Sequence, residues 1–252
     1  MDTELKLLHR AIERVRDEQR HIQREHDAFE TFRQRIGRAR TVAVSGPECA
    51  NETGDVLEAY RETVASAIDT EAEYGQSVDE HLRTKLSTSV ASTILSDGSE
   101  NVTHRFKRDL LLSVTETIED REAFEEILKA ERDSLRTTNE GLLDIKRRLD
   151  RVADPSETVR GNVDSKTNGG DCERVIEKCD RLSKRRQQRV ADHRRVAGHL
   201  SDDAHSLNRY LYAGLETEFP AIRAIATTWN RLTRHCDEAV SRPEDGIEQS
   251  MD

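Results

Sequence analysis

The chain of 252 residues is 34% hydrophobic, 36% charged and only 4% aromatic, whereas ordinary soluble domains are roughly 45–50% apolar and about 25% charged. A compact sphere of this mass would lack side chains to fill its centre, so the composition favours an elongated protein with a thin core. Apolar runs such as 110–112 are far below the ~18 residues of a membrane span, and the first residues lack the basic and apolar segments of a secretory signal. We therefore expect a cytoplasmic protein that does not enter a membrane.

The charge bias indicates a saline environment. Fifty acidic residues against forty basic ones give a formal charge of −10, and only eight of the basic residues are lysine. Same-sign charge repels at low ionic strength, and molar salt removes that penalty by shortening the Debye length to about 3 Å. We predict a halophilic protein whose helicity requires molar salt. A GC-rich genome, which also replaces lysine by arginine, is the alternative explanation.

Residues 1–38 form the first predicted helix. Apolar side chains recur every seven residues from Leu8 to Ile36, and a companion row starts apolar but becomes polar at Gln19 and His26. Two such rows are typical of a coiled-coil seam. We expect this helix to be one strand of a stalk, packed either in cis or in trans.

Residues 39–102 are predicted to form a helical head segment. After a loop that contains Pro47, a stripe of apolar residues spaced by four marks a short amphipathic helix over 55–69. Ser77 and Glu80 have the spacing of a capping box, which predicts a second helix over 77–95.

Residues 103–209 are predicted to form a long antiparallel hairpin of two helices, 103–153 and 171–209. Both lack proline, the strongest helix breaker. The polar, glycine-containing residues 154–171 are expected to form a flexible tip. Each helix carries heptad rows that are apolar except for a few charges, notably Arg121, Glu131 and Arg186.

Two registers of this hairpin are open. The favoured register sets Ile145 opposite Cys179 and Thr138 opposite Arg186, so that apolar residues meet apolar ones and polar residues meet polar ones. A slip of one heptad pairs Glu131 with Arg186 instead, but leaves the last apolar layer unmatched. A slip of one heptad in the opposite direction would set Ile145 against Arg186 and Glu131 against Leu200. Burying a lone charge in this way costs several kcal/mol, so that register is excluded.

The last predicted helix lies within 210–241 and begins near Pro220, a residue suited to the first helical position. Its apolar stripe runs from Ile222 to Cys236, and we assign it to the head as well. Residues 242–252 are expected to be a disordered tail. The fold class is thus all-α: an elongated antiparallel coiled-coil stalk of three long helices with a small helical head.

Several local sequences resemble a family of uncharacterised helical coiled-coil proteins of halophilic archaea. They are the first heptad helix, AYRET at 59–63, YGQSVDEHL at 74–82, and the segments 106–128 and 210–220. The resemblance implies a halophilic cytoplasm and a helical fold. It implies no activity, because the matching residues are packing and turn residues.

No catalytic or cofactor motif stands out. The chain lacks the Gly-x-Gly spacing of phosphate-binding loops, the Gly-x-Ser-x-Gly elbow and the His-Glu-x-x-His pair. Glu18 and His21 have the Glu-x-x-His spacing of di-iron bundles, but those sites need two such pairs, and His21 is expected to point outward. We therefore expect no enzyme, no cofactor and no metal.

The remaining chemically active side chains have structural interpretations. His26 and His193 fall in heptad seams, where we expect satisfied core histidines rather than metal ligands or a pH switch. None of the four cysteines forms a Cys-x-x-Cys pair, and small buried hydrophobes are the better interpretation. The cysteines are Cys49, Cys172, Cys179 and Cys236.

The stretch 181–195 is a candidate interaction site. It holds seven basic residues and a single acid, and Arg185, Arg186 and Arg189 are the candidate phosphate-binding residues. The interleaved aromatics of single-strand binders are missing, and phosphate binding weakens at high salt, so an ion-paired or solvated face is favoured. The sequence therefore predicts a non-enzymatic structural or protein-interaction protein whose partner is itself or another helical protein. A nucleic-acid-associated protein that uses 181–195 is the alternative.

Overall fold

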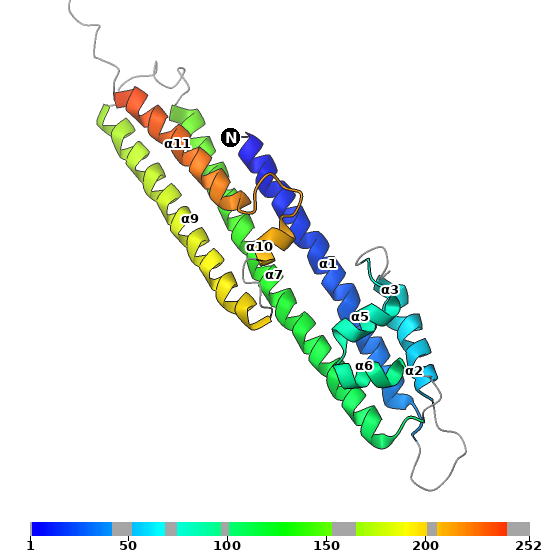
Figure 1. Cartoon of the computed structure of the whole chain (residues 1–252). Coiled ribbons are helices and arrows are strands. Elements are labelled where there is room, and N and C mark those ends of the chain that lie inside the picture. Colours follow the sequence, from blue (N-terminus) through cyan, green and yellow to red (C-terminus); the bar gives the residue numbers. More distant parts are fainter. Residues whose placement is uncertain are drawn as a thin grey trace, which may run out of the picture. The chain divides into compact units, whose positions relative to one another are not determined.

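The computed structural model describes residues 2–41, 52–68, 75–96, 101–152, 165–200 and 206–240. In this part of the chain the regular elements are helices, apart from isolated bridge residues such as the pair Glu52 and Asn101, so the all-α prediction is confirmed (Figure 1). The helices group into two compact units: a central unit of residues 17–129 and a terminal unit of residues 1–16 with 130–252. None of the described helices is both long enough and apolar enough to cross a membrane.

Two long helices contribute to both units, α1 (Asp2–Arg38) and α7 (His104–Val152). Within the central unit they run antiparallel, because Glu25 of α1 contacts Arg121 of α7 whereas Gly37 lies beside Lys107. The Lys107 ammonium donates to the Gly37 carbonyl at 2.8 Å and so closes the C-terminal end of α1. The helix bounds agree with the predictions of 1–38 and 103–153.

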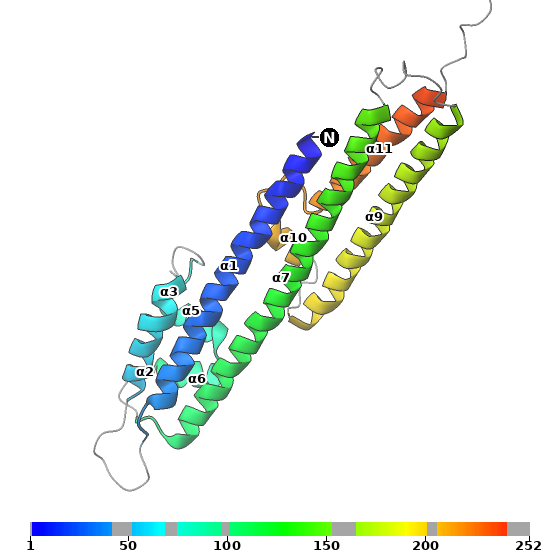
Figure 2. The same ribbon diagram turned by 180° about the vertical axis from the view of Figure 1, so that it is seen from behind.

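A helix with a π-helical turn packs beside the C-terminal half of α1 in the central unit (Figures 1 and 2). Its parts are α2 (Thr53–Tyr60), the π-helical segment η1 (Arg61–Ala65) and α3 (Ser66–Ile68). The junction residues Arg61 and Ser66 keep right-handed helical φ and ψ, so the three parts form one uninterrupted helix. This helix confirms the one predicted over 55–69.

The single helix predicted over 77–95 is wrong, because two short helices replace it: α5 (Val78–Lys85) and α6 (Thr88–Ile94). The predicted capping box is present, since the Ser77 hydroxyl accepts from the Glu80 N–H and the Glu80 carboxylate accepts from the Ser77 N–H. The break falls at Leu86, whose backbone is extended with φ −108° and ψ 159°.

Hydroxyl groups of α7 stabilise this break. The backbone N–H of Ser87 donates to Oγ of Ser113 at 2.8 Å, and the Thr117 hydroxyl donates to the Lys85 carbonyl at 2.6 Å. A break in a buried helix normally leaves unpaired backbone groups. Here α7 supplies the missing partners, which the apolar spacing of the segment does not reveal.

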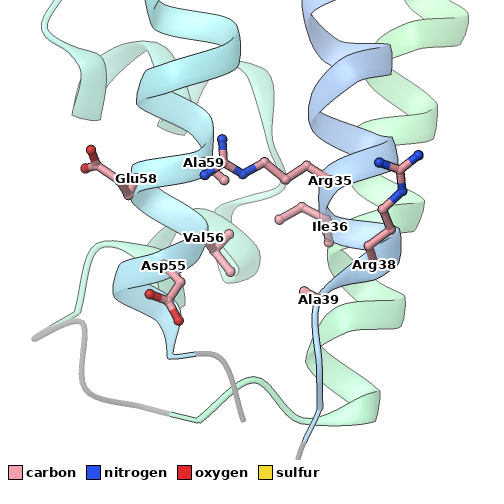
Figure 3. A pocket seen from close by; sticks show the side chains of 8 residues that line it. All are labelled: Arg35, Ile36, Arg38, Ala39, Asp55, Val56, Glu58 and Ala59. Carbon is pink, nitrogen blue, oxygen red and sulfur yellow. The ribbon is translucent and has the colours of Figure 1, made fainter. Parts of the chain in front are cut away.

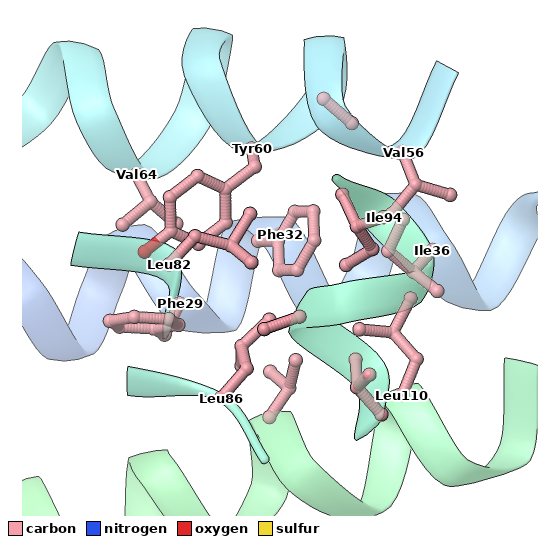
Figure 4. Close-up of a cluster of buried hydrophobic side chains, with 14 of the residues drawn as sticks. Phe29, Phe32, Ile36, Val56, Tyr60, Val64, Leu82, Leu86, Ile94 and Leu110 are labelled. Atoms are coloured by element: carbon pink, nitrogen blue, oxygen red, sulfur yellow. The ribbon is translucent and has the colours of Figure 1, made fainter. Parts of the chain in front are cut away.

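The core of the central unit lies where these helices meet (Figure 4). Tyr60 stands edge-on to Phe32 and Phe29, with ring centroids 5.4 Å and 6.1 Å apart, a favoured aromatic geometry. Labelled core residues in the figure are Phe29, Phe32, Ile36, Val56, Tyr60, Val64, Leu82, Leu86, Ile94 and Leu110.

The terminal unit contains α9 (Ser165–Leu200), α10 (Ser206–Leu211) and α11 (Pro220–Val240). Pro220 occupies the first helical position as predicted. The returning helix differs from the predicted 171–209, since it starts at Ser165 and stops at Leu200. Residues 165–171 therefore belong to α9 and not to the expected tip, because an established helix adds residues at little cost. The rest of the tip, like the tail 242–252, lies outside the described residues.

The last helix packs on α9, and its assignment to the head is wrong. The Cys179 thiol of α9 donates to the Ile225 carbonyl of α11 at 3.8 Å, and both helices fall in the terminal unit. Figures 1 and 2 show the two helices side by side. The apolar stripe of α11 identified its buried face, but such a stripe does not specify the partner.

The hairpin of α7 and α9 contains features of both expected registers. Leu182 packs so closely on Gly141 that a Cβ there would lie 2.7 Å from its Cδ1, and Lys178 pairs with Asp144 at 2.6 Å. Both contacts fall within two residues of the favoured register. The Arg186 side chain, however, pairs with Glu131, which is the charge pair of the slipped register.

Candidate functional site

The structure separates the three candidate phosphate-binding residues of α9. Arg186 is only 1% exposed, Arg185 is exposed and Arg189 is half-buried. A buried guanidinium cannot reach a nucleic acid, so Arg186 is removed from the predicted basic site. Its role lies inside the terminal unit.

Arg186 belongs to a buried cluster with Glu131 and Tyr212, which we call the terminal cluster. Its Nη1 and Nη2 donate to Oε2 and Oε1 of Glu131 at 2.7 Å and 2.5 Å, and the Tyr212 hydroxyl donates to Oε1 as well. Nη1 also donates to the Ser134 hydroxyl at 3.2 Å. A bidentate arginine–carboxylate pair is strong and directional. The cluster thereby joins α7, α9 and the turn after α10.

Burial and the Glu131 carboxylate together determine the pKa values of Arg186 and Tyr212. Burial opposes the charge on Arg186, but the Glu131 carboxylate outweighs it and raises the arginine pKa. Burial, aided by the same carboxylate, raises the Tyr212 pKa well above its ordinary value. The phenol therefore stays a donor and the guanidinium stays charged, so the terminal cluster holds its protons and acts as a fixed cross-link.

A second buried cluster, the central cluster, surrounds Glu25 of α1, whose side chain is fully buried. Arg121 Nε lies 2.6 Å from Oε2, and Lys85 Nζ lies 3.5 Å from Oε1. Nε2 of His21 and Nε2 of His81 lie 3.9 Å and 4.0 Å from Oε1. One carboxylate is thus surrounded by nitrogen atoms from three helices, α1, α5 and α7.

Tyr60 completes the central cluster through His81. The Tyr60 hydroxyl and Nδ1 of His81 are 2.7 Å apart, and both side chains are fully buried. Because Nε2 of His81 faces a carboxylate, the tautomer protonated at Nε2 is favoured, and Nδ1 then accepts from the phenol. Burial, followed by the negative charge of Glu25, raises the Tyr60 pKa and keeps that donor in place.

Burial opposes the positive charge of Lys85 in this cluster. Burial lowers the pKa of Lys85, and the Glu25 carboxylate only partly offsets the effect. Its side chain is 14% exposed and that of Arg121 is 16% exposed, so both cations keep some contact with water.

The histidines and acids of the metal hypothesis are placed differently from expectation. His21 does not point outward, since it is 14% exposed and faces Glu25. His26 lies 3.2 Å from Asp27 and 3.5 Å from Glu122 and is an ion-pairing histidine; the side chain of His193 lies outside the described residues. In the described part of the chain, no group of three or more His, Cys, Asp or Glu residues is placed to hold a metal ion.

The described cysteines are free thiols. Cys179 and Cys236 are buried, as expected for small hydrophobes, whereas Cys172 is partly exposed. Burial, with a smaller contribution from Asp180, raises the pKa of Cys179 to about 11. That thiol stays protonated and unreactive at neutral pH. Cys49 lies outside the described residues.

The open clefts of the described surface include one in each unit. The first, of about 330 Å³, lies in the central unit between the end of α1 and the start of α2 (Figure 3). Arg35 crosses toward α2 and forms an ion pair with Glu62, while Val56 and Ile36 provide an apolar floor. The second, of about 270 Å³, lies in the terminal unit where Val190 of α9 faces Phe219 and Ile222. Neither brings together an acid, a base and a nucleophile.

Comparisons with known proteins identify the family. No curated protein and no solved structure matches the chain. A family model described as a domain of unknown function, DUF7260, matches residues 6–236, which is most of the chain and spans both buried clusters. The chain therefore belongs to the DUF7260 family.

Proposed function

We propose that the chain is a non-enzymatic helical interaction protein of a saline cytoplasm, which contacts itself or another helical protein through its exposed helix faces. One observation carries the proposal. The side chains best suited to acid–base or nucleophilic chemistry, such as Glu25, His81, Glu131 and Cys179, are buried and make contacts inside the units. Buried and satisfied groups hold helices together but do not reach a substrate.

The exposed helix faces are where this protein can meet a partner. They are densely charged, and the large apolar side chains exposed on them, Leu112 at 58% and Tyr210 at 50%, stand singly. A single exposed apolar residue is not a patch. Contacts through such faces depend on charge, so we expect partners to be selected by charge pattern.

A nucleic-acid-associated role remains the second candidate, because Arg181, Lys184 and Arg185 are exposed on one side of α9. Burial of Arg186 weakens it, since one of the three candidate contacts is lost. Steep loss of phosphate binding with salt weakens it further in a saline cell.

A pull-down tests the proposal. The full chain is immobilised and exposed to a lysate of its source cells at their own salt concentration, with one half treated with nuclease. We expect the same protein to be retained from both halves, and not by an equally acidic unrelated bait. Retention from the untreated half alone would support the nucleic-acid role, and no retention from either half would contradict the interaction proposal.

A further inference from the structure

We propose that the chain associates with a second copy of itself through an acidic triplet on α7 and a basic triplet on α9. The acidic triplet is Glu116, Glu119 and Asp120, and the basic triplet is Arg181, Lys184 and Arg185. This inference rests on the proposed function, since it names the partner of those exposed faces.

The two triplets have the same spacing. Each occupies positions i, i+3 and i+4 of a helix, so its three side chains form one surface stripe. All six side chains are exposed. When two helices lie parallel, a shift of 65 residues puts Glu116 beside Arg181 and brings the other two pairs together at the same time. One alignment therefore satisfies three opposite-charge pairs.

The charges of the triplets are largely unused within the chain. Lys184 pairs with Asp180 at 2.7 Å in an exposed contact that is easily exchanged. Within the part of the chain that the structure describes, the other five make no ion pair. Their surroundings have the same signs: segment 116–126 holds six acids and one arginine, whereas 181–189 holds no acid and five basic residues, of which Arg186 is buried.

Two further features favour a protein face over a nucleic acid as the occupant. Arg121, the basic residue inside the acidic segment, turns inward to Glu25, so the outward face is purely acidic. Leu112, 58% exposed, lies one turn before Glu116 and supplies an apolar contact at the end of the stripe. Because acidic and basic stripes belong to the same chain, a second copy carries the complement of each.

Charge reversal followed by mixing is the decisive experiment. One variant carries Arg181→Glu with Arg185→Glu, and the other carries Glu116→Arg with Asp120→Arg. Sedimentation equilibrium of the full chain is measured at the lowest salt at which circular dichroism shows full helicity. We expect wild type to self-associate and each variant alone to associate about tenfold more weakly or worse, because like charges then face each other. An equimolar mixture of the two variants should recover association.

A matched control changes the same net charge elsewhere. Arg231→Glu with Arg234→Glu replaces two exposed arginines of α11 and should leave self-association within about twofold of wild type. Raising the salt from 0.1 M to 1 M shortens the Debye length from about 10 Å to about 3 Å, so association should weaken across any part of that range in which the chain is folded.

Three results would overturn the inference: a wild-type chain that stays monomeric up to millimolar concentration, reversal variants that associate like wild type, or a mixture that does not recover. Retention of another protein in the pull-down together with a monomeric chain would leave the interaction proposal standing and remove only self-association. Tight binding of the basic triplet to an oligonucleotide, abolished by Arg181→Glu with Arg185→Glu, would replace the second copy by nucleic acid.

Discussion

Among the residues that the structure describes, two carboxylates are buried, Glu25 and Glu131, and they are held in opposite ways. In the terminal unit the Arg186 guanidinium donates two short hydrogen bonds to the Glu131 carboxylate, and both side chains are almost completely buried. In the central unit Arg121 Nε lies 2.6 Å from the Glu25 carboxylate, and nitrogen atoms of Lys85, His21 and His81 lie 3.5–4.0 Å from it. Removal of Arg186 would leave Glu131 without its main cationic partner, whereas removal of one cation near Glu25 would leave other nitrogen atoms close to its carboxylate. Their tolerance of substitution should differ accordingly.

Loss of Arg186 is expected to have the largest effect. Arg186→Met leaves Glu131 charged and buried without its main partner, and breaking a buried pair in this way costs about 3–5 kcal/mol. The measurement is urea unfolding at molar salt, followed by circular dichroism. Adding Glu131→Leu to Arg186→Met should restore most of the lost stability, because no uncompensated charge remains. If the unfolding free energy of Arg186→Met alone lay within about 1 kcal/mol of the wild-type value, Glu131 would not depend on Arg186 as we infer.

The tyrosines of the two clusters provide a matched pair. Tyr212→Phe removes a hydrogen bond to a buried carboxylate and should lower the free energy of unfolding by about 1.5–3 kcal/mol. Tyr60→Phe removes a hydrogen bond to Nδ1 of His81 and should cost about 1 kcal/mol. Both rings keep their packing in the variants, so denaturation midpoints compare the hydroxyls directly. Equal losses would show that the two clusters do not differ as the geometry indicates.

Lys85→Met tests whether the central cluster tolerates the loss of one of its cations. Glu25 keeps Arg121 at 2.6 Å, so the variant should unfold within about 1 kcal/mol of wild type at neutral pH. The wild type should also gain stability as pH rises through the lowered pKa of folded Lys85 toward the ordinary lysine value, because the unfolded chain binds more protons over that range. The variant should lack this gain. Unfolding curves at neutral and alkaline pH decide the point.

The smallest effect is expected at the half-exposed His26. Burial opposes its protonation, but hydrogen bonds and charge from Asp27 and Glu122 raise its pKa overall. Its contribution to stability is therefore present below the ordinary histidine pKa and is lost as pH rises through the folded value. His26→Gln should remove that dependence and shift the unfolding free energy by a few tenths of a kcal/mol. A pH series of melting curves on both proteins measures the difference.

The terminal cluster was partly visible in the sequence. Glu131 and Arg186 both interrupt heptad rows that are otherwise largely apolar, and a buried charge needs an opposite charge nearby. The pairing of the two was among the registers that the pattern allowed. Apolar matching alone favoured the other register, because it does not consider how far a long guanidinium can reach along the hairpin.

Glu25 was missed because it lies on a third face of α1. The predicted seam used the rows of Leu8 and Leu5, but a further row at heptad spacing passes through Ala11, Glu18, Glu25 and Phe32. Ala11 and Phe32 at its ends are fully buried. Acids flanked by buried apolar residues, together with Arg121 in an apolar row of α7, are the signal that predicts a central ion pair.

Helix bounds were predicted more accurately than helix partners. Caps, proline positions and apolar periodicity are local, so α1, α7 and the start of α11 were found within a few residues. The division of 77–95 into two helices depends on two hydroxyl groups of α7, one that accepts and one that donates a hydrogen bond, and the placement of α11 on α9 depends on matching surfaces. Both are properties of the folded chain that one segment alone does not carry.

The π-helical turn at Arg61–Ala65 accommodates one extra residue in the helix formed by α2, η1 and α3. Four residues of an α-helix advance about 400°, so side chains spaced by four drift about 40° per step around the axis. A row of four would drift about 120° and leave the core. The π turn, with its i to i+5 hydrogen bonds, winds more slowly and turns the row back. Each member of the row is at most 1% exposed: Val56, Tyr60, Val64 and Ile68. Deletion of the exposed Arg61 would convert the spacing 4-4-4 into the 4-3-4 of a regular α-helix with the same buried face, so the π turn lets this helix carry one residue more than its core requires.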